Sequence, residues 1–181
     1  MPNWARVARR IRVPTGFAFA VVYFWLAQPT AQSLLIGAAI AAIGLAVRTV
    51  ASGHVQKNEQ LTRSGPYAYL RNPLYFGSII LAVGLAVAAR NWWIAICLLV
   101  MFLLIYLPVI WSEEAFLGAK FPEFDEYSRN VPRLIPRLTA FGSAKGGFSW
   151  ALYCKHREYN AVLGTALMLL ILAAKLIWWS A

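Results

Sequence analysis

Residues 92–111 read WWIAICLLVMFLLIYLPVIW, an apolar run in which no side chain is charged. A membrane-spanning helix needs about 20 predominantly apolar residues, which is the length of this run. Four further runs share its character, and they cover Val13–Ala27, Leu34–Ser52, Leu74–Ala89 and Ala161–Trp179. Two of these, Val13–Ala27 and Leu74–Ala89, are short for a span. The sequence predicts an all-α fold, a polytopic membrane helix bundle of about five transmembrane helices.

The composition of the chain supports a membrane protein. Hydrophobic residues make up 60% of its 181 residues and charged residues 13%, whereas an ordinary soluble domain has about 25% charged residues. The net charge of +10 raises the possibility of nucleic-acid binding, but the basic residues lie between apolar runs. That placement favours contact with membrane lipids, and we expect no nucleic-acid partner. Cys97 and Cys154 have no pairing or ligand spacing, so we expect neither a disulfide nor a metal site.

The loops between the runs predict the topology. Gln28-Pro29-Thr30 and Arg90-Asn91 are typical of tight turns, so the first four helices should form two hairpins. With the N-terminus inside, every lysine and arginine except Arg90 and Lys175 lies on the inner side, as do all seven acidic residues. Lys175 can extend outward beside Trp178 and Trp179. We therefore expect an N-in, C-out protein of the cell (inner) membrane, multi-pass, with its polar site facing the cytoplasm.

The basic start of the chain, Arg6 to Arg12, followed by an apolar run also resembles a signal peptide. No convincing small-x-small cleavage site follows it, and a hairpin partner does, so a first membrane helix is the preferred interpretation.

Small residues on two of the runs predict a close helix contact. Gly37, Ala41 and Gly44 lie near one face of the second run, and Gly77 and Gly84 lie on the third. Such residues allow helix backbones to approach closely, and ordinary bundle packing is the preferred interpretation of the glycines.

The apolar runs carry no charge near their middle, where transporters usually place ionisable groups. This argues against transport, but a small membrane carrier of a neutral substrate stays open as an alternative. Pro108 should kink the fourth helix because it removes one backbone hydrogen bond.

Polar residues gather instead in two segments. The first, residues 54–75, reads HVQKNEQLTRSGPYAYLRNPLY. Ser64–Tyr67 predicts a turn, and Pro73 suits the first position of a helix whose positive N-terminal end would attract a carboxylate or phosphate. Tyr67, Tyr69 and Tyr75 add aromatic faces for a base or a cation. An aromatic belt at the membrane interface is an equally good interpretation of these tyrosines.

The second polar segment, residues 113–137, opens with the adjacent carboxylates Glu113 and Glu114. At a helix C-terminal end they oppose the helix dipole and each other, so they call for a cation. A ligand with an ammonium or sulfonium group would supply one. A solvated helix face that runs on to Lys120 is the alternative.

The motifs in these segments resemble a known superfamily. They are Ser64-Gly-Pro-Tyr-x-x-x-Arg-Asn-Pro-x-Tyr75, Glu113-Glu-x-x-Leu117, Phe121-Pro-x-Phe-x-x-Tyr127 and Val131-Pro-Arg-x-x-Pro136. Together they are similar to the isoprenylcysteine carboxyl methyltransferase and phospholipid methyltransferase superfamily, membrane enzymes that use S-adenosylmethionine. The resemblance covers about residues 34–137. It implies a methyltransferase core over residues 1–137, followed by a linker, an interfacial helix and a fifth transmembrane helix over residues 138–181.

The resemblance also implies roles for individual residues. The residues implied to bind the cofactor S-adenosylmethionine are Lys57, Leu61, Thr62, Tyr67, Asn72, Pro73, Leu74, Tyr75 and Glu113. As a separate hypothesis about the reaction, Glu114 or His54 could accept a proton from an amine acceptor, and Asn72 is a further candidate catalytic residue. His54 capping the second helix is the plainer alternative. Arg71 and Arg133 could bind the cofactor carboxylate or brace the loops.

Two departures from the superfamily pattern bear on the methyl acceptor. Asn72 replaces the usual histidine and cannot take a positive charge. Val109 stands where isoprenylcysteine enzymes carry an arginine for the substrate carboxylate. The sequence therefore predicts methyl transfer to a lipophilic amine, on a lipid or a small molecule, with a prenylcysteine carboxylate as the alternative acceptor.

The tail after Pro136 lies outside the motifs. Gly142–Gly147 predicts a flexible link, and Phe148–Tyr159 combines aromatic with basic residues, a pattern that suits a helix lying on the inner leaflet. The fifth apolar run would then return through the membrane.

Overall fold

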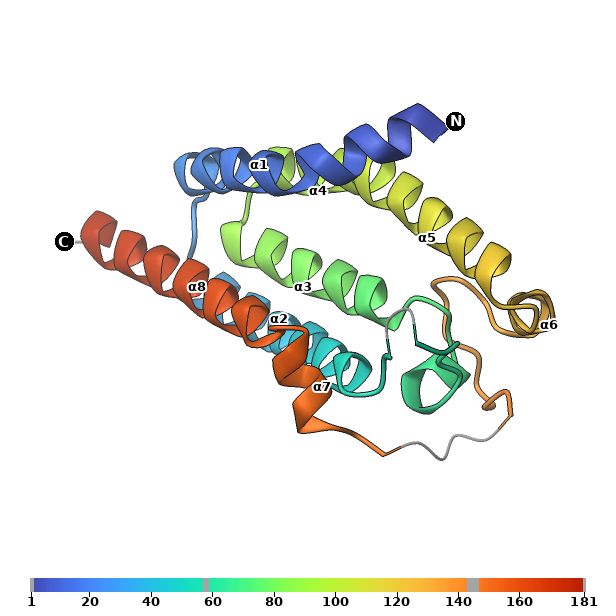
Figure 1. The fold of residues 1–181 in the computed structure, drawn as a ribbon. Coiled ribbons are helices and arrows are strands. Elements are labelled where there is room, and N and C mark those ends of the chain that lie inside the picture. The colour runs from blue at the N-terminus through green and yellow to red at the C-terminus, as the bar shows by residue number, and fades with distance from the viewer. Residues whose placement is uncertain (1, 57–58, 143–146, 181) are drawn as a thin grey trace. The chain divides into compact units, whose positions relative to one another are not determined.

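The computed structural model describes residues 2–56, 59–142 and 147–180, and within these ranges every regular element is a helix. Figure 1 shows their course along the chain. The elements are α1 (Pro2–Leu26), α2 (Ala31–Ser52), η1 (Gly65–Ala68), α3 (Pro73–Ala89), α4 (Trp92–Met101), η2 (Phe102–Tyr106), α5 (Leu107–Lys120), α6 (Phe124–Asn130), α7 (Trp150–Lys155) and α8 (Tyr159–Ser180). The all-α prediction is confirmed for the part of the chain that the structure describes.

Four of the five predicted apolar runs lie entirely within helical structure, and the first, Val13–Ala27, extends one residue past the end of α1 at Leu26. Three helical stretches are long and apolar enough to cross a membrane, and they are Ala31–Ser52, Trp92–Lys120 and Tyr159–Trp178. Val13–Leu26 and Pro73–Ala89 are shorter apolar helices. Five membrane crossings and the N-in, C-out orientation stay predictions.

The chain folds into two compact units. Unit 1 comprises residues Met1–Ala41, Ala82–Ala115 and Thr165–Ala181, and unit 2 comprises Ala42–Leu81 and Phe116–Gly164. Helices α2, α3, α5 and α8 contribute residues to both units. The division into residues 1–137 and 138–181 stays a prediction.

In unit 1 the two tight turns predicted from sequence bond to each other. The Gln28 amide donates to the Ala89 carbonyl at 2.8 Å, and Asn91 Nδ2 donates to the Leu26 carbonyl at 2.8 Å. Asn91 Oδ1 also accepts from the Trp93 amide and so caps the start of α4. The polar groups of both turns therefore have partners.

Lys175 of α8 contacts the end of α1 in the same unit. Its ammonium donates to the carbonyls of Phe24 at 2.6 Å, Ala27 at 2.7 Å and Trp25 at 3.2 Å. The last carbonyls of a helix lack partners within that helix and carry partial negative charge, so a cation there stabilises the helix end. Lys175 has this role in addition to any extension toward the membrane surface.

Pro108 acts together with a π-helical segment. It cannot donate a hydrogen bond to the carbonyl of Leu104, and that carbonyl accepts instead from Trp4 Nε1 at 2.9 Å. Directly before Pro108, residues Phe102–Tyr106 are π-helical, and the Leu107 amide donates to the Phe102 carbonyl. The expected irregularity in the fourth run is thus an insertion in the helical ladder, of a kind often found at functional sites.

The small residues of α2 and α3 let these two helices approach each other closely within each unit. In unit 1 a Cβ added at Gly37 would lie 2.5 Å from the Gly84 carbonyl oxygen, and one at Gly84 would lie 2.5 Å from the Ala41 amide nitrogen. In unit 2 a Cβ at Gly44 would lie 2.6 Å from the Leu81 amide nitrogen. The helices meet backbone to backbone, so only residues without a side chain fit there.

The tail of the chain forms a shorter helix than expected, and its placement at the membrane interface stays a prediction. The predicted helix over Phe148–Tyr159 is limited to Trp150–Lys155, capped by Ser149 Oγ, which accepts from the Leu152 amide at 3.3 Å. Arg157, with a φ of 52°, ends it before α8 begins. The predicted link Gly142–Gly147 falls largely outside the described residues.

Candidate functional site

The Ser64–Tyr67 motif in unit 2 forms a turn, as the sequence predicts. Gly65 has a φ of 57°, a left-handed conformation that favours glycine, and Pro66 opens the 3-10 helix Gly65–Ala68. A Cβ at Gly65 would also lie 2.4 Å from Cδ2 of the His54 ring. Glycine is therefore required here by both backbone conformation and space.

His54 lies at the end of α2 with its ring against this turn. Its Nδ1 is 2.7 Å from the Val50 carbonyl, so Nδ1 carries the proton that is donated to that oxygen. In the neutral ring Nε2 is then the acceptor nitrogen. The contact is compatible with the helix-end role foreseen for His54, and it also leaves the ring in the tautomer that a base acting through Nε2 requires.

Thr62 is buried and supports the loop that follows α2. Its Oγ1 accepts from the Gln56 amide at 3.1 Å. The structure thus assigns the Thr62 hydroxyl to the fold of the loop. Lys57, the first of the residues implied to bind the cofactor, lies outside the described residues.

The segment after the turn is bound to the chain that follows α6. The Arg71 amide donates to the Pro132 carbonyl at 2.9 Å, and the Arg137 amide donates to the Tyr69 carbonyl at 3.0 Å. Asn72 Nδ2 donates to the Arg133 carbonyl at 3.3 Å. The Arg-Asn-Pro motif and the Val-Pro-Arg motif, about 60 residues apart in sequence, therefore lie together in unit 2.

A small hydrophobic cluster fixes the same region. Phe124, Tyr127 and Val131 form its buried part, with Leu61 packed against them. The Tyr127 hydroxyl donates to the Tyr67 carbonyl at 2.8 Å. Leu61 and Tyr67 are thereby held beside α6, which explains why the Phe-x-x-Tyr motif accompanies the turn motif.

Helix α3 begins at Pro73, as predicted from sequence, and the Asn72 carbonyl accepts from the Phe76 amide at 3.0 Å. The start of a helix directs its first backbone N–H groups and a partial positive charge outward. Leu74 and Tyr75 belong to this first turn. The Leu74 carbonyl is held by Ser78 Oγ at 2.9 Å and by Arg48.

Arg48 is a residue of this region that sequence reasoning missed. It forms an ion pair with the buried Glu158, which precedes α8, and it donates to Ser78 Oγ on α3. All three residues belong to unit 2. The available signal was Glu158 itself, a lone carboxylate in the basic stretch Lys155-His-Arg-Glu.

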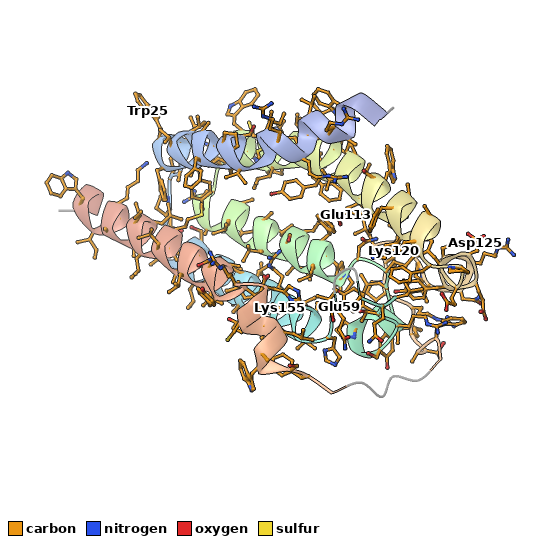
Figure 2. The ribbon with its side chains drawn as sticks, viewed as in Figure 1. Trp25, Glu59, Glu113, Lys120, Asp125 and Lys155 are labelled. Atoms are coloured by element: carbon orange, nitrogen blue, oxygen red, sulfur yellow. The ribbon has the colours of Figure 1, made fainter. Side chains whose placement is uncertain are left out.

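Glu113 and Glu114 lie in unit 1 on α5, which continues to Lys120. Glu113, labelled in Figure 2, is exposed, whereas Glu114 is buried. Arg9 of α1 donates to Oγ of Ser112, the residue before Glu113, at 2.6 Å. Val109, one turn earlier, is fully buried, so this position offers no cation for a carboxylate.

Among the described residues, no group of three or more His, Cys, Asp or Glu side chains comes together as metal ligands would.

The phospholipid methyltransferase family matches residues 16–123, more than half of the chain. The chain belongs to this family, and the superfamily predicted from its motifs is confirmed.

Two curated relatives are named for resistance to metals. The "Cobalt-zinc-cadmium resistance protein CzcN" of Cupriavidus metallidurans is 33% identical over 158 residues, which cover 82% of this chain and 71% of the relative. The "Nickel-cobalt-cadmium resistance protein NccN" of Alcaligenes xylosoxydans xylosoxydans is 35% identical over 120 residues, 66% of this chain and 55% of the relative. No solved structure matches the chain significantly.

Proposed function

We propose that this protein is an integral membrane methyltransferase that transfers the methyl group of S-adenosylmethionine to a lipophilic amine, on a lipid or a small molecule. Membership of the phospholipid methyltransferase family is the observation that carries this proposal. The proposed location is the cell (inner) membrane, multi-pass, with the reaction on the cytoplasmic side.

The residues of unit 2 fit the cofactor by their chemistry. The start of α3 at Pro73–Tyr75 offers backbone N–H groups and a partial positive charge, which suit the carboxylate of a methionine moiety. Tyr67 and Tyr75 offer aromatic faces for an adenine ring. Leu61, Thr62 and Asn72 belong to the loops that frame them. Lys57 is included on the resemblance alone.

Glu113 is proposed, on the family motif, to bind the amino group of the cofactor. When bound, S-adenosylmethionine supplies an electrophilic methyl group on a sulfonium sulfur. A carboxylate beside that sulfur would stabilise the charged ground state, and the charge is lost in the transition state. Glu113 therefore serves better at the amino group, where its contact is the same throughout the reaction.

The protein's further tasks are orientation and proton removal. Holding the reactants in line accelerates the transfer because it removes the need for a chance encounter. An amine acceptor must lose its proton to expose a lone pair, and we propose that Glu114 or His54 Nε2 accepts it. The Asn72 side-chain amide donates to the Arg133 carbonyl. Asn72 would therefore keep the loop before α3 in place against the segment after α6.

The neutral and buried Val109 favours the amine over the carboxylate acceptor. A prenylcysteine carboxylate needs a cation, and Val109 cannot supply one. The two acceptors are distinguished chemically, because base hydrolyses a methyl ester and leaves an N-methyl group intact. The experiment transfers labelled methyl groups to lipid extracts, lipophilic amines and a prenylated cysteine, and then treats the products with base. Loss of the label identifies a methyl ester, and retention of the label identifies an N-methyl group.

The decisive experiment is calorimetric binding of S-adenosylhomocysteine to the purified, detergent-solubilised protein. We expect micromolar binding by the wild type, loss of binding by Glu113→Gln, and normal binding by Glu123→Gln, which neutralises another exposed carboxylate. Glu114→Gln should bind normally but turn over slowly. A folded wild type that binds neither S-adenosylhomocysteine nor S-adenosylmethionine contradicts the proposal.

The relatives' names also give the proposal a physiological setting. We propose that, if this chain contributes to metal tolerance, it does so through its methylated product. Cells that carry Glu113→Gln should then lose tolerance to cobalt or cadmium to the same degree as cells without the protein. Full tolerance with Glu113→Gln would separate the phenotype from methyl transfer.

A further inference from the structure

The segment that follows residue 147 lies beyond the family match, which ends at residue 123, yet it contacts the loop after α2. We propose that residues 148–158 form a clamp that holds this loop, residues 53–56 and 59–65, in the conformation that binds S-adenosylmethionine. The clamp thereby sets cofactor affinity. This inference rests on the proposed function, and all residues concerned belong to unit 2.

Phe148 is the centre of the clamp. A Cβ at Gly53 would lie 2.3 Å from its ring, so ring and backbone are in direct contact. The next residue, Ser149, donates its amide to the Gly53 carbonyl at 2.9 Å. The Phe148 ring also meets the His54 ring edge to face, with centroids 6.2 Å apart. The clamp therefore fixes the point at which α2 ends and the loop begins.

The contacts of Phe148 reach the turn motif through His54. The His54 ring lies against Gly65, where no side chain fits, so a displaced His54 would disturb the Ser64–Tyr67 turn. Phe148, His54 and Gly65 thus form a continuous stack from the tail to the family motif. Packed side chains transmit such displacements because protein interiors have little free space.

Further contacts follow along the tail. His156 Nδ1 is 3.2 Å from the Ser52 carbonyl, and the buried Glu158 pairs with Arg48, which also holds the Leu74 carbonyl at the start of α3. Lys155 Nζ donates to Glu59 Oε1 at 2.9 Å, a pair that Figure 2 labels. One short segment therefore contacts the loop after α2 directly and reaches the start of α3 through Arg48.

The described parts of the loop also form hydrogen bonds of their own. The His54 and Val55 amides donate to the Ala51 carbonyl at 3.2 Å each, the Gln56 amide donates to Thr62 Oγ1, and the Glu59 amide donates to the Gln56 carbonyl at 3.3 Å. The proposal requires that packing against the clamp adds to these bonds in selecting the conformation that binds the cofactor. If only a tenth of the molecules kept the binding conformation, the apparent Kd would rise about tenfold.

The experiment uses the full chain in detergent micelles and compares Phe148→Ala with Tyr159→Ala, which removes an aromatic side chain of similar exposure, 40% against 37%. Hydrogen exchange of the amides of residues 53–56 is measured without cofactor, and S-adenosylhomocysteine affinity by calorimetry. We expect Phe148→Ala to exchange faster and to bind about tenfold more weakly. The same variant should raise KM for S-adenosylmethionine.

A second variant tests the contact itself. Gly53→Ala places a methyl group on the Phe148 ring and should weaken binding in the wild-type background. In the Phe148→Ala background the same change should have no further effect, since the ring is gone. Additive losses would show that Gly53 and Phe148 act separately, and would overturn the clamp.

The outcomes separate the two proposals. A wild type that binds no cofactor overturns the proposed function, while hydrogen exchange still reports whether Phe148 holds the loop. Exchange and affinity that are the same in Phe148→Ala as in Tyr159→Ala overturn the clamp and leave the proposed function standing. Equal thermal stability of the two variants ensures that neither result reflects unfolding.

Discussion

Units 1 and 2 satisfy their polar groups in different ways. In unit 1, side chains bond to backbone carbonyls at helix irregularities and helix ends, as Trp4, Asn91 and Lys175 do. In unit 2, an ion pair joins the partly buried Arg48 of α2 to the buried Glu158 in the turn before α8, and loop backbones bond to each other. In apolar surroundings every backbone polar group without a hydrogen-bond partner is costly. In a more polar region, charged side chains can also pair with each other. The comparison teaches that the two units satisfy their polar groups by different means, with side chains bonded to backbone carbonyls in unit 1 and with an ion pair and bonds between loop backbones in unit 2.

The largest expected effect on stability comes from breaking the ion pair of unit 2. Glu158→Gln leaves the Arg48 charge without its carboxylate, and removing one partner of a buried pair costs about 3–5 kcal/mol. Thermal unfolding followed by tryptophan fluorescence should report this loss. The double variant Arg48→Met with Glu158→Leu should be much more stable than the single one. Equal losses in the single and the double variant would show that the pair is not the source of the stability.

The next largest effect on stability comes from disturbing the close contact between α2 and α3 in unit 1. Gly84→Ala places a methyl group 2.5 Å from the Ala41 amide nitrogen, and such overpacking costs about 1–3 kcal/mol. Gly16→Ala is the control, because a Cβ at Gly16 meets nothing within 4 Å. It should raise stability slightly, since alanine is the better helix former. A Gly84→Ala variant that unfolds like Gly16→Ala contradicts the close contact.

A smaller effect tests the hydrogen bond that replaces the one lost at Pro108. Trp4→Phe removes the donor to the Leu104 carbonyl and should cost about 0.5–1.5 kcal/mol. Pro108→Ala returns an N–H to the helix, so Trp4→Phe should cost less in that background. The unfolding temperatures of the four proteins give the coupling. An undiminished cost would mean that Trp4 acts through packing alone.

The smallest effect concerns the exposed pair of Lys155 with Glu59, whose side chains are 63% and 57% exposed. Lys155→Ala should change stability by at most about 1 kcal/mol, because solvent screens such pairs. The change should vanish at high salt. A salt-independent loss above about 2 kcal/mol would show that the pair is buried more deeply than its exposure indicates.

Local features of the chain were predictable because their causes are local. Pro73 opens α3 since proline suits a first helical position, and Gly65 takes a positive φ within the turn marked by Pro66. The tight turns at Gln28–Thr30 and Arg90–Asn91 followed from their residues in the same way. The superfamily motifs led to the family that the comparisons support.

Other features were outside the reach of the sequence because they join distant residues. Arg48 forms an ion pair with Glu158, 110 residues away, and no sequence motif in either segment indicates the other as its partner. Lys175 was expected to extend toward the membrane surface, and only the fold shows that it holds the last carbonyls of α1. The structure also separated the adjacent Glu113 and Glu114 into an exposed and a buried carboxylate.

The sequence by itself determined that this protein is helical, that it belongs with membrane proteins, and which motifs carry its family. Hydrophobic run length and the chemistry of proline and glycine act over a few residues, so they can be read directly from the chain. Only the tertiary structure decided how the tail contacts the loop after α2 and which charge neutralises Arg48. Those contacts depend on packing in three dimensions, where residues far apart in sequence become neighbours.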